Sequence, residues 1–451
     1  MKKGFIFLSI IFLVNVVFSG QIASAEEALP MEMSFSAAIK YSLENNNNIR
    51  AMRKGLSATE RDIGITRSVM LPKVSFNEFF AATNNPTDTL AYRLNQSVAV
   101  AGDLSVPTLN HPPGVTNFLT SGILEQRILD KKSIIEIKMA KKEYSASGYF
   151  FLRKQEDLVN QVAQAYVVVI TNQELVKVAE QNISDAKDHL SVAESKYKSK
   201  SGLNADVLRL KSGVEEREEQ LVSAQRDLNV SRRSLGLLLG LEIAVEPIST
   251  VPDLNLHEID YYKRFSVYRN DIKAAEIRVE NSKNNIKSAQ AEWYPTLSAL
   301  GSYNFNNANF PFGGTGSNYI AGAFLKWVAI DGNKRKYEIL KAKDQEAEAR
   351  EYLEGFKKQV GFKIYEAYSK VKENQRNLEL ATEAQKQAEF DAVEVQKRWE
   401  KSQLPLVALT DAQINLNNTR LDVVKHRNEL KSSLITLSYE RGIIYYELAL
   451  K

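Results

Sequence analysis

Apolar residues recur at alternating intervals of three and four along two separate stretches of the chain. One stretch carries this spacing through Leu378, Ala381, Gln385, Ala388, Ala392, Val395 and Trp399. The other lies 202 positions earlier (399 − 197 = 202) and carries it through Val176, Ala179, Ile183, Ala186, Leu190, Ala193 and Tyr197. Such spacing is typical of helices that pack as coiled coils, and alanine in the seam permits close approach. The pattern predicts two copies of one long helix.

Short breaks in the apolar pattern predict that each long helix reverses into a second helix. Glycine and proline are rare within the long stretches and reappear near residues 201–204 and 402–405. Helices usually end at such residues, so each copy is predicted to form a long antiparallel hairpin. Helices of this length cannot bury their apolar stripes in one compact globule and need neighbours. The hairpin helices are expected at about 131–200 and 204–238, and at about 333–402 and 406–441.

A repeated proline segment precedes each hairpin. Asn48 is followed by Pro72, and Asp271 is followed at the same distance by Pro295 (72 − 48 = 295 − 271 = 24). Because proline disfavours helix in the residue before it, both prolines are predicted to mark helix-to-strand transitions. The chain is therefore predicted to be an internal duplication, with two copies of one structural unit. The repeats are expected at 26–250 and 251–451, with their first helices at 34–70 and about 258–293.

The residues after each proline alternate between apolar and polar. Between residues 296 and 306, one side of the segment carries Leu297, Ala299, Gly301, Tyr303 and Phe305. One apolar and one polar face is what a strand between lipid and water requires. The pattern also fits two β-hairpins on a soluble periplasmic coiled-coil protein. Strands are predicted at about 74–81, 118–128, 296–306 and 319–330, with loops at 84–113 and 306–318.

The beginning of the chain has the features of a secretory signal. Lys2 and Lys3 precede an apolar run from Phe5 to Phe18, and Ala23-Ser24-Ala25 follows as a small-residue cleavage site. Residues 1–25 are therefore predicted to be a signal peptide. No later stretch contains 18 consecutive apolar residues, so no transmembrane helix is expected. Four strands are too few to close a barrel, so a membrane barrel would need several chains.

Composition and isolated motifs give no sign of catalysis. The 59 basic residues nearly balance the 55 acidic ones, which gives no support for a nucleic-acid partner. Cysteine is absent, and His111, His189, His257 and His426 lack metal-ligand spacing. The glycine-rich segment 313–317 is not followed by the Gly-Lys-Ser/Thr of a phosphate loop. No metal, cofactor or catalytic site is predicted, and the chain is not expected to be an enzyme.

From about Phe35 to Gly442 the chain resembles the TolC family of outer-membrane efflux proteins. The resemblance rests on the doubled proline segment, two strands and one long hairpin per half, and Ala165-Tyr166 repeated as Ala367-Tyr368. It implies a mainly α fold with a minor β part. Duplicated helical hairpins would form an α-helical barrel, and four strands per chain would contribute to a trimeric 12-stranded transmembrane β-barrel.

The resemblance also implies a function. The chain would be the passive homotrimeric duct of a tripartite efflux or type I secretion system, exporting small molecules or proteins. It would lie in outer-membrane lipid with a long periplasmic extension. Its partners would be a periplasmic adaptor (membrane fusion) protein and an inner-membrane pump of the RND, ABC or MFS type. The alternative is that the chain is itself a periplasmic coiled-coil adaptor, which would be expected to carry one hairpin rather than two.

The resemblance places the closed end of the duct near the hairpin turns, where Asp206 and Asp411 lie. Translating position 206 by 202 gives 408, so these acids lie one helical turn apart in equivalent helices. In a trimer they could form two rings of carboxylates that favour cations. Arg209 and Ala408 occupy the complementary positions, where the family often has acids. Alternatively, both acids are solvated residues stabilised by the helix dipole.

Further candidates surround the two turns. Tyr197 and Trp399 end the two apolar seams and could constrict the duct, contact an adaptor or belong to the coiled-coil core. By resemblance alone, the candidate adaptor contacts are the turn residues Gly202, Leu203, Leu404 and Pro405.

Overall fold

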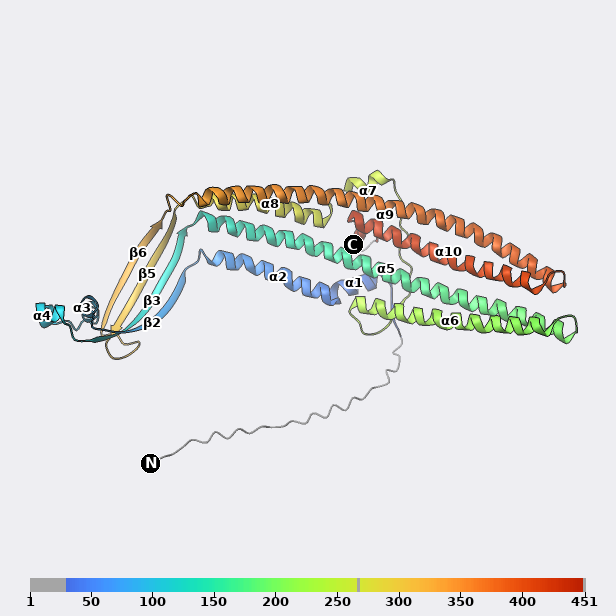
Figure 1. Ribbon diagram of the computed structural model, residues 1–451, viewed down its shortest axis with the longest axis horizontal. Helices are drawn as coiled ribbons and strands as arrows, with labels where there is room; N and C mark the ends of the chain where they lie inside the picture. The colour runs from blue at the N-terminus through green and yellow to red at the C-terminus, as the bar shows by residue number, and fades with distance from the viewer. Residues whose placement is uncertain (1–29, 266–267, 449–451) are drawn as a thin grey trace, which may run out of the picture.

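Figure 1 shows the computed structural model of the chain, an elongated molecule with a sheet at one end and long helices over the rest. The structure describes residues 30–265 and 268–448. The predicted signal peptide, residues 1–25, lies outside these ranges. Among the helices in the described ranges, none combines the length and apolar character needed to cross a membrane.

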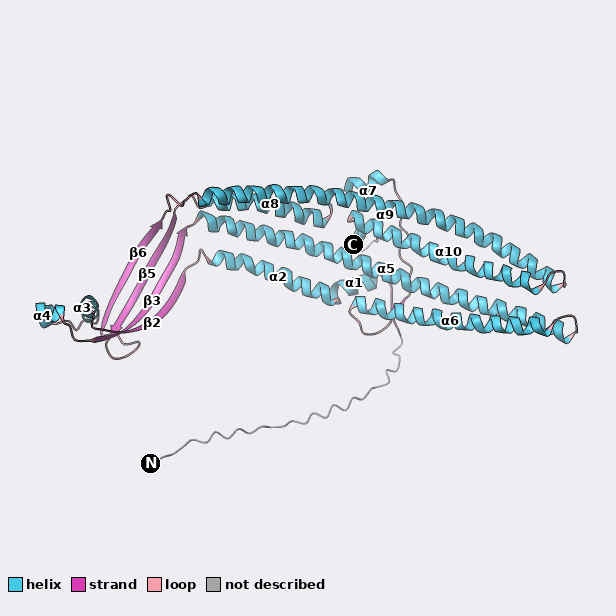
Figure 2. Ribbon diagram, in the orientation of Figure 1, coloured by secondary structure: helices cyan, strands magenta, loops and turns pink. Residues whose placement is uncertain are grey.

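Two long hairpins make up most of the molecule (Figure 2). Helices α5 and α9 contain 68 and 67 residues, so each is about 100 Å long at ~1.5 Å per residue. Each returns through a helix of 36 residues, and the two return helices begin 202 positions apart (406 − 204). The repeated pattern therefore folds into two copies of one hairpin. The helices are α5 (Lys131–Lys198), α6 (Asn204–Leu239), α9 (Lys334–Glu400) and α10 (Leu406–Arg441).

The helices lie side by side in a single layer (Figure 1). In the half nearest the sheet the order is α2 (Asn47–Ser68), α5, α8 (Asn270–Ala291) and α9. In the half nearest the turns the order is α6, α5, α10 and α9. Helices α5 and α9 thus run the whole length, while α6 continues the line of α2, and α10 that of α8. A layer one helix thick leaves two outer edges without a partner.

Two predicted helices are each divided in the structure. Instead of one helix over 34–70, α1 (Phe35–Asn45) precedes α2. Asn46 makes the break, because its Oδ1 caps α2 while its Nδ2 donates to the backbone oxygen of Leu238 at 2.8 Å. Instead of one helix over 258–293, α7 precedes α8. Arg269 makes that break and donates to the equivalent carbonyl, that of Glu440 (440 − 238 = 202). Helix α7 spans Ile259–Phe265.

The four longer strands form an antiparallel sheet in the order β2-β3-β5-β6. Pro72 and Pro295 stand directly before β2 and β5. The last strand was expected at 319–330, but β6 pairs with β5 only as far as Lys326, which lies opposite Thr296 at the start of β5. Without a partner the strand ends there. The strands are β2 (Lys73–Thr83), β3 (Val115–Leu129), β5 (Thr296–Asn307) and β6 (Gly316–Lys326).

The register gives the sheet two different faces, because residues directly opposite each other share a face. The apolar face carries Phe76, Phe80, Phe118, Tyr303, Phe305, Tyr319, Ala321, Ala323 and Leu325. The polar face carries Ser75, Asn77, Asn117, Ser121, Ser302, Asn304, Asn306 and Asn318, interrupted by Phe79, Leu119, Ile123, Leu300, Ile320 and Phe324. Alternation of this kind suits a sheet that separates lipid from water.

Two elements of the fold were not expected from the sequence. Strand β1 (Met31–Met33) pairs in parallel with β4 (Val245–Pro247) and ties the start of the described chain to the middle of α5. Tyr166 is fully buried there; its hydroxyl donates to the backbone oxygen of Met33 at 3.0 Å, and its ring lies 5.3 Å from that of Phe35.

The segment 84–113, predicted to be a loop, contains short helices in the structure. Asn85 accepts hydrogen bonds from two backbone N–H groups of the first helix, and Pro86 occupies its first turn. Arg93 and Asp103 form a salt bridge of 2.5 Å that braces the segment. It lies at the end of the sheet farthest from the long helices (Figure 1). The helices are α3 (Pro86–Asn95), η1 (Ala101–Leu104) and α4 (Val106–Asn110).

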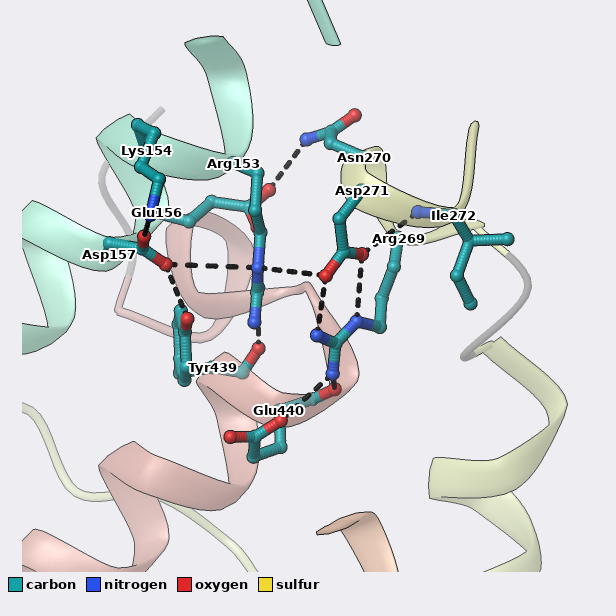
Figure 3. A network of polar contacts seen from close by, with 10 residues as sticks. All are labelled: Arg153, Lys154, Glu156, Asp157, Arg269, Asn270, Asp271, Ile272, Tyr439 and Glu440. Carbon is teal, nitrogen blue, oxygen red and sulfur yellow. Dashed lines mark hydrogen bonds and ion pairs between the residues drawn. The ribbon is translucent and has the colours of Figure 1, made fainter. Parts of the chain in front are cut away.

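A charged network joins the two repeats (Figure 3). Arg153 of α5 is 4% exposed, and its Nη1 donates to Glu156 Oε2 at 2.8 Å and to the backbone oxygen of Tyr439 at 2.9 Å. Its Nε lies 3.5 Å from Asp271 Oδ2 at the start of α8. Arg269 donates to both oxygens of Asp271, at 3.0 and 2.7 Å. Two buried guanidinium groups are therefore satisfied by groups from α5, α8 and α10.

Burial and pairing oppose each other at the acids of this network. Burial raises the pKa of Glu156 above its ordinary value, although the hydrogen bond from Arg153 acts to lower it. Burial also acts to raise the pKa of Asp271, but the hydrogen bonds and charge of Arg269 outweigh it and the pKa is lowered. The contribution of Asp271 to stability is therefore present above its unfolded pKa of about 3.9 and is lost as the pH falls through the lower folded value.

Replacing Arg153 with methionine is expected to loosen the contact between the repeats. The change removes one partner of a buried charge cluster, which typically costs about 3–5 kcal/mol. Amide hydrogen exchange should accelerate at the start of α8 and the end of α10. Arg226→Met is the matched control, since among the described residues Arg226 pairs with its neighbour Asp227 alone, and its side chain is 71% exposed. Equal exchange in the two variants would show that the network contributes no more than a surface pair.

Candidate functional site at the hairpin tips

The two hairpin turns have the same backbone although their sequences differ. Lys200 and Ser402, 202 positions apart, both adopt the left-handed conformation, with φ of 60° and 59°. In each turn the following residue donates its N–H to a carbonyl five residues earlier, at 2.9 Å. The left-handed conformation costs a residue with a side chain about 1–2 kcal/mol. The turn geometry is therefore imposed by helix packing and not by a local preference for glycine.

The two turns face each other across a groove of about 320 Å³. Of the eight turn and gate candidates, Asp411 and Tyr197 do not line it. The groove brings together the other six: Gly202, Leu203 and Asp206 from the first tip, and Trp399, Leu404 and Pro405 from the second. Both tips lie at the end of the molecule farthest from the sheet (Figure 1).

Lys196 ties the tips together and was not singled out from the sequence. Its Nζ donates to the backbone oxygen of Trp399 and stands 4.4 Å from the centroid of the indole ring. A second contact of 3.5 Å reaches Ser402 Oγ. A lysine near a helix end carries no distinctive sequence signal, because its partner here belongs to the other repeat. The interaction combines a charge-assisted hydrogen bond with a cation–π contact.

The two aromatic residues that end the seams have different environments. Trp399 is only 4% exposed, whereas Tyr197 at the equivalent position is 48% exposed. The core that surrounds the indole comes from both hairpins and includes Ala193, Leu210, Leu406 and Leu409. Trp399 therefore packs between the tips, while Tyr197 lies on the surface.

The two acids also differ in position. Asp206 lies in the first turn of α6 and is half-buried in the groove beside Lys196 and Lys200. Asp411 is the sixth residue of α10 and is exposed. The helix dipole acts within the first turn, so it can stabilise Asp206 but hardly Asp411. Neither acid forms a salt bridge with another described residue. Across the described chain, no three His, Asp or Glu side chains are grouped so as to hold a metal ion.

The turn residues present one prominent apolar side chain. Leu203 is 68% exposed, Leu404 is half-buried and Pro405 is exposed. Gly202 is confined, since a Cβ there would lie 2.9 Å from Lys196 Cβ. An exposed leucine on the tip of a long hairpin is a feature expected of a contact surface.

Replacing Trp399 with alanine is expected to loosen both tips. Removing a buried tryptophan typically costs about 3–5 kcal/mol, and the ring that Lys196 contacts is lost with it, although the backbone oxygen that accepts its hydrogen bond remains. Hydrogen exchange should accelerate in the last turns of α5 and α9 and the first turns of α6 and α10. Tyr197→Ala is the matched control and should leave exchange nearly unchanged. If the tyrosine variant loosened the tips as much, the assignment of Trp399 to the core would be wrong.

The model of the family described as "Outer membrane efflux protein" matches residues 38–241 and 263–439. A relative is the pyoverdine export outer membrane protein OpmQ of Pseudomonas putida, 28% identical over 144 residues, or 31% of each chain. Another is the toluene efflux pump outer membrane protein TtgF of a second P. putida strain, 23% identical over 57% of this chain and 51% of the relative. The chain thus matches 31% and 51% of the length of these two relatives.

Solved structures extend the likeness of fold to almost the whole chain. The outer membrane protein VceC of Vibrio cholerae is 15% identical, with a TM-score of 0.73 over 90% of this chain and 96% of that one. The outer membrane channel MtrE of Neisseria gonorrhoeae is 14% identical, with a TM-score of 0.72 over 91% and 89%. The adaptor alternative is not favoured, because the family match includes both repeats. The chain belongs to the outer membrane efflux protein family, whose members are channel proteins.

Proposed function

We propose that three copies of this chain form a passive export duct that crosses the outer membrane and extends through the periplasm. The observation that carries the proposal is that both layers of the chain, the sheet and the helices, end in open edges at both sides. Neither layer can be completed by another described part of the same chain. Closure by identical copies completes both layers at once.

The sheet would have to close into a barrel because its apolar face would lie in lipid. Edge strands β2 and β6 each pair on one side only. The apolar face would contact lipid, where each unpaired backbone N–H or C=O group costs several kcal/mol. Pairing β2 of one copy with β6 of the next satisfies both edges, and three copies supply twelve strands (3 × 4). The polar face then surrounds a water-filled passage.

The helical layer also has two open edges that neighbouring copies would cover. Its outer edges are α9 on one side and α2 followed by α6 on the other. Both edges carry apolar side chains that are 62% to 77% exposed: Tyr352, Phe362 and Phe390 on α9, and Val222, Val230 and Leu237 on α6. Exposed apolar stripes on long helices are buried when helices pack side by side. Three layers in a ring would form a helical tube in line with the barrel.

The duct would work with partners at its tips. A periplasmic adaptor protein would contact the turns, with Leu203 as the main apolar contact, and an inner-membrane pump of the RND, ABC or MFS type would supply energy. The two named relatives refer to pyoverdine and toluene, which favours small molecules as cargo. Because the duct is passive, the pump would select the cargo.

The assembly has a measurable mass and shape. Protein extracted from outer membranes in detergent should behave as three chains of 50.8 kDa each, less the signal peptide. Light scattering gives the mass, and electron microscopy should show a particle longer than the roughly 100 Å of α5 alone. A soluble periplasmic monomer or an elongated dimer would contradict the proposal.

Charge at the tips is expected to influence ion selectivity. In a trimer Asp206 and Asp411 would each occur three times near the narrow end of the duct. Replacing both with asparagine should reduce cation selectivity, measured as a reversal potential in a planar bilayer, because carboxylate rings attract cations. Ala408→Asp should increase it by adding an acid at the level of Asp206. Asp62→Asn, an exposed acid near the sheet, is the control; an unchanged reversal potential in the double variant would refute the ring.

A further inference from the structure

The connection between β2 and β3 folds back over the polar face of the sheet. Gln96, at the end of α3, is 1% exposed. Its Nε2 donates to the backbone oxygen of Thr116 and to Asn117 Oδ1, both at 2.8 Å. Asn117 in turn donates to Asn306 Oδ1 of β5 at 3.0 Å. Both asparagines belong to the polar face near its distal end, so the end of α3 contacts that face and not the apolar one.

A second chain of amide groups fastens α3 to the edge of the sheet. Asn318 of β6 donates to Asn95 Oδ1 at 3.5 Å and accepts a hydrogen bond from Asn304 Nδ2 at 2.9 Å. Side chains from β3, β5 and β6 therefore hold the segment together. The amides of Gln96, Asn117 and Asn306 are buried, and a buried amide network favours a single arrangement because each displaced group would lose its partner inside the protein.

Gly316 lets the segment approach the sheet closely. A Cβ at this position would lie 1.9 Å from the backbone oxygen of Asn95 and 2.8 Å from the backbone carbon of Gln96. No side chain fits between the end of α3 and β6. The absence of a side chain at Gly316 is therefore required for the segment to lie where it does.

The segment also exposes several large apolar side chains. Leu94, Val100 and Val106 are 57%, 61% and 71% exposed. The salt bridge between Arg93 and Asp103 connects α3 to η1 within this segment. Apolar constrictions in a water-filled passage hinder ions and polar solutes, because water leaves them readily.

We propose that residues 86–110 form a fixed constriction at the distal mouth of the duct, which keeps large polar solutes from entering from outside. This inference rests on the proposed function, since the polar face must line the passage. Three copies would place three such segments around one opening. The second repeat has no equivalent: its connection is residues 308–315, eight residues (315 − 308 + 1), against 31 in 84–114 (114 − 84 + 1).

Access past the mouth can be measured by cysteine labelling, because the chain has no cysteine of its own. Ser302→Cys places one thiol on the polar face of β5. Maleimides of increasing size are applied to the outside of intact cells. Gly316→Ala is then added to displace the segment. Gly322→Ala is the matched control, since it lies on the same strand and face but a Cβ there meets nothing within 4 Å.

The Gly316→Ala protein should be labelled by larger maleimides than the parent, and the Gly322→Ala protein should behave like the parent. Replacing 84–114 with the short connection 308–315 should admit larger reagents still, and tests the idea without any strain in β6. Equal labelling of the parent and both opened variants at every size would overturn the constriction. So would an equal gain in the Gly322→Ala protein. Failure of the parent to form a trimer in the membrane would instead count against the proposed duct.

Discussion

Backbone groups at the edge of an open sheet must be paired when the sheet lies in lipid, and this requirement governs the architecture of the chain. Four strands with an apolar face leave β2 and β6 half-paired. The same strands continue into helices that lie in one layer, so the helical layer inherits the same open edges. The prolines at 72 and 295 make this continuity possible, since each stops a helix directly before a strand. In the proposed duct, pairing between copies would complete both the sheet and the helical layer.

The helical layer is built from two repeats of one unit, but the two repeats differ at equivalent positions. The break before α2 is made by the neutral amide of Asn46, whereas the break before α8 is made by Arg269. That exchange places a buried charge where the repeats meet and connects it to Arg153 of the other repeat through Asp271 (Figure 3). At the tips, the same asymmetry puts Trp399 in the core and leaves Tyr197 outside. Each repeat has thus been adapted to its place beside the other.

The long helices could be predicted because their apolar spacing persists over many turns, and the strands because their faces alternate. The division of two helices could not, since Asn46 finds its partner carbonyl 192 positions away. Strands β1 and β4 have three residues each, too few for a pattern. In the candidate site, spacing located the turns and both aromatic residues, but burial of Trp399 depends on the other hairpin. Lys196 and the amide cluster around Gln96 are visible only in three dimensions.

Closure of the sheet by identical copies can be tested directly in the membrane, again because the chain has no cysteine. Asn77→Cys on β2 is combined with single cysteines along the same face of β6, at Asn318, Ile320 and Gly322. At the matching register, oxidation should give covalent products of two and three chains and nothing larger, and none of the single-cysteine proteins should give a product of three chains. A ladder that continues beyond three chains, or no cross-link at any register, would contradict a closed ring of three copies.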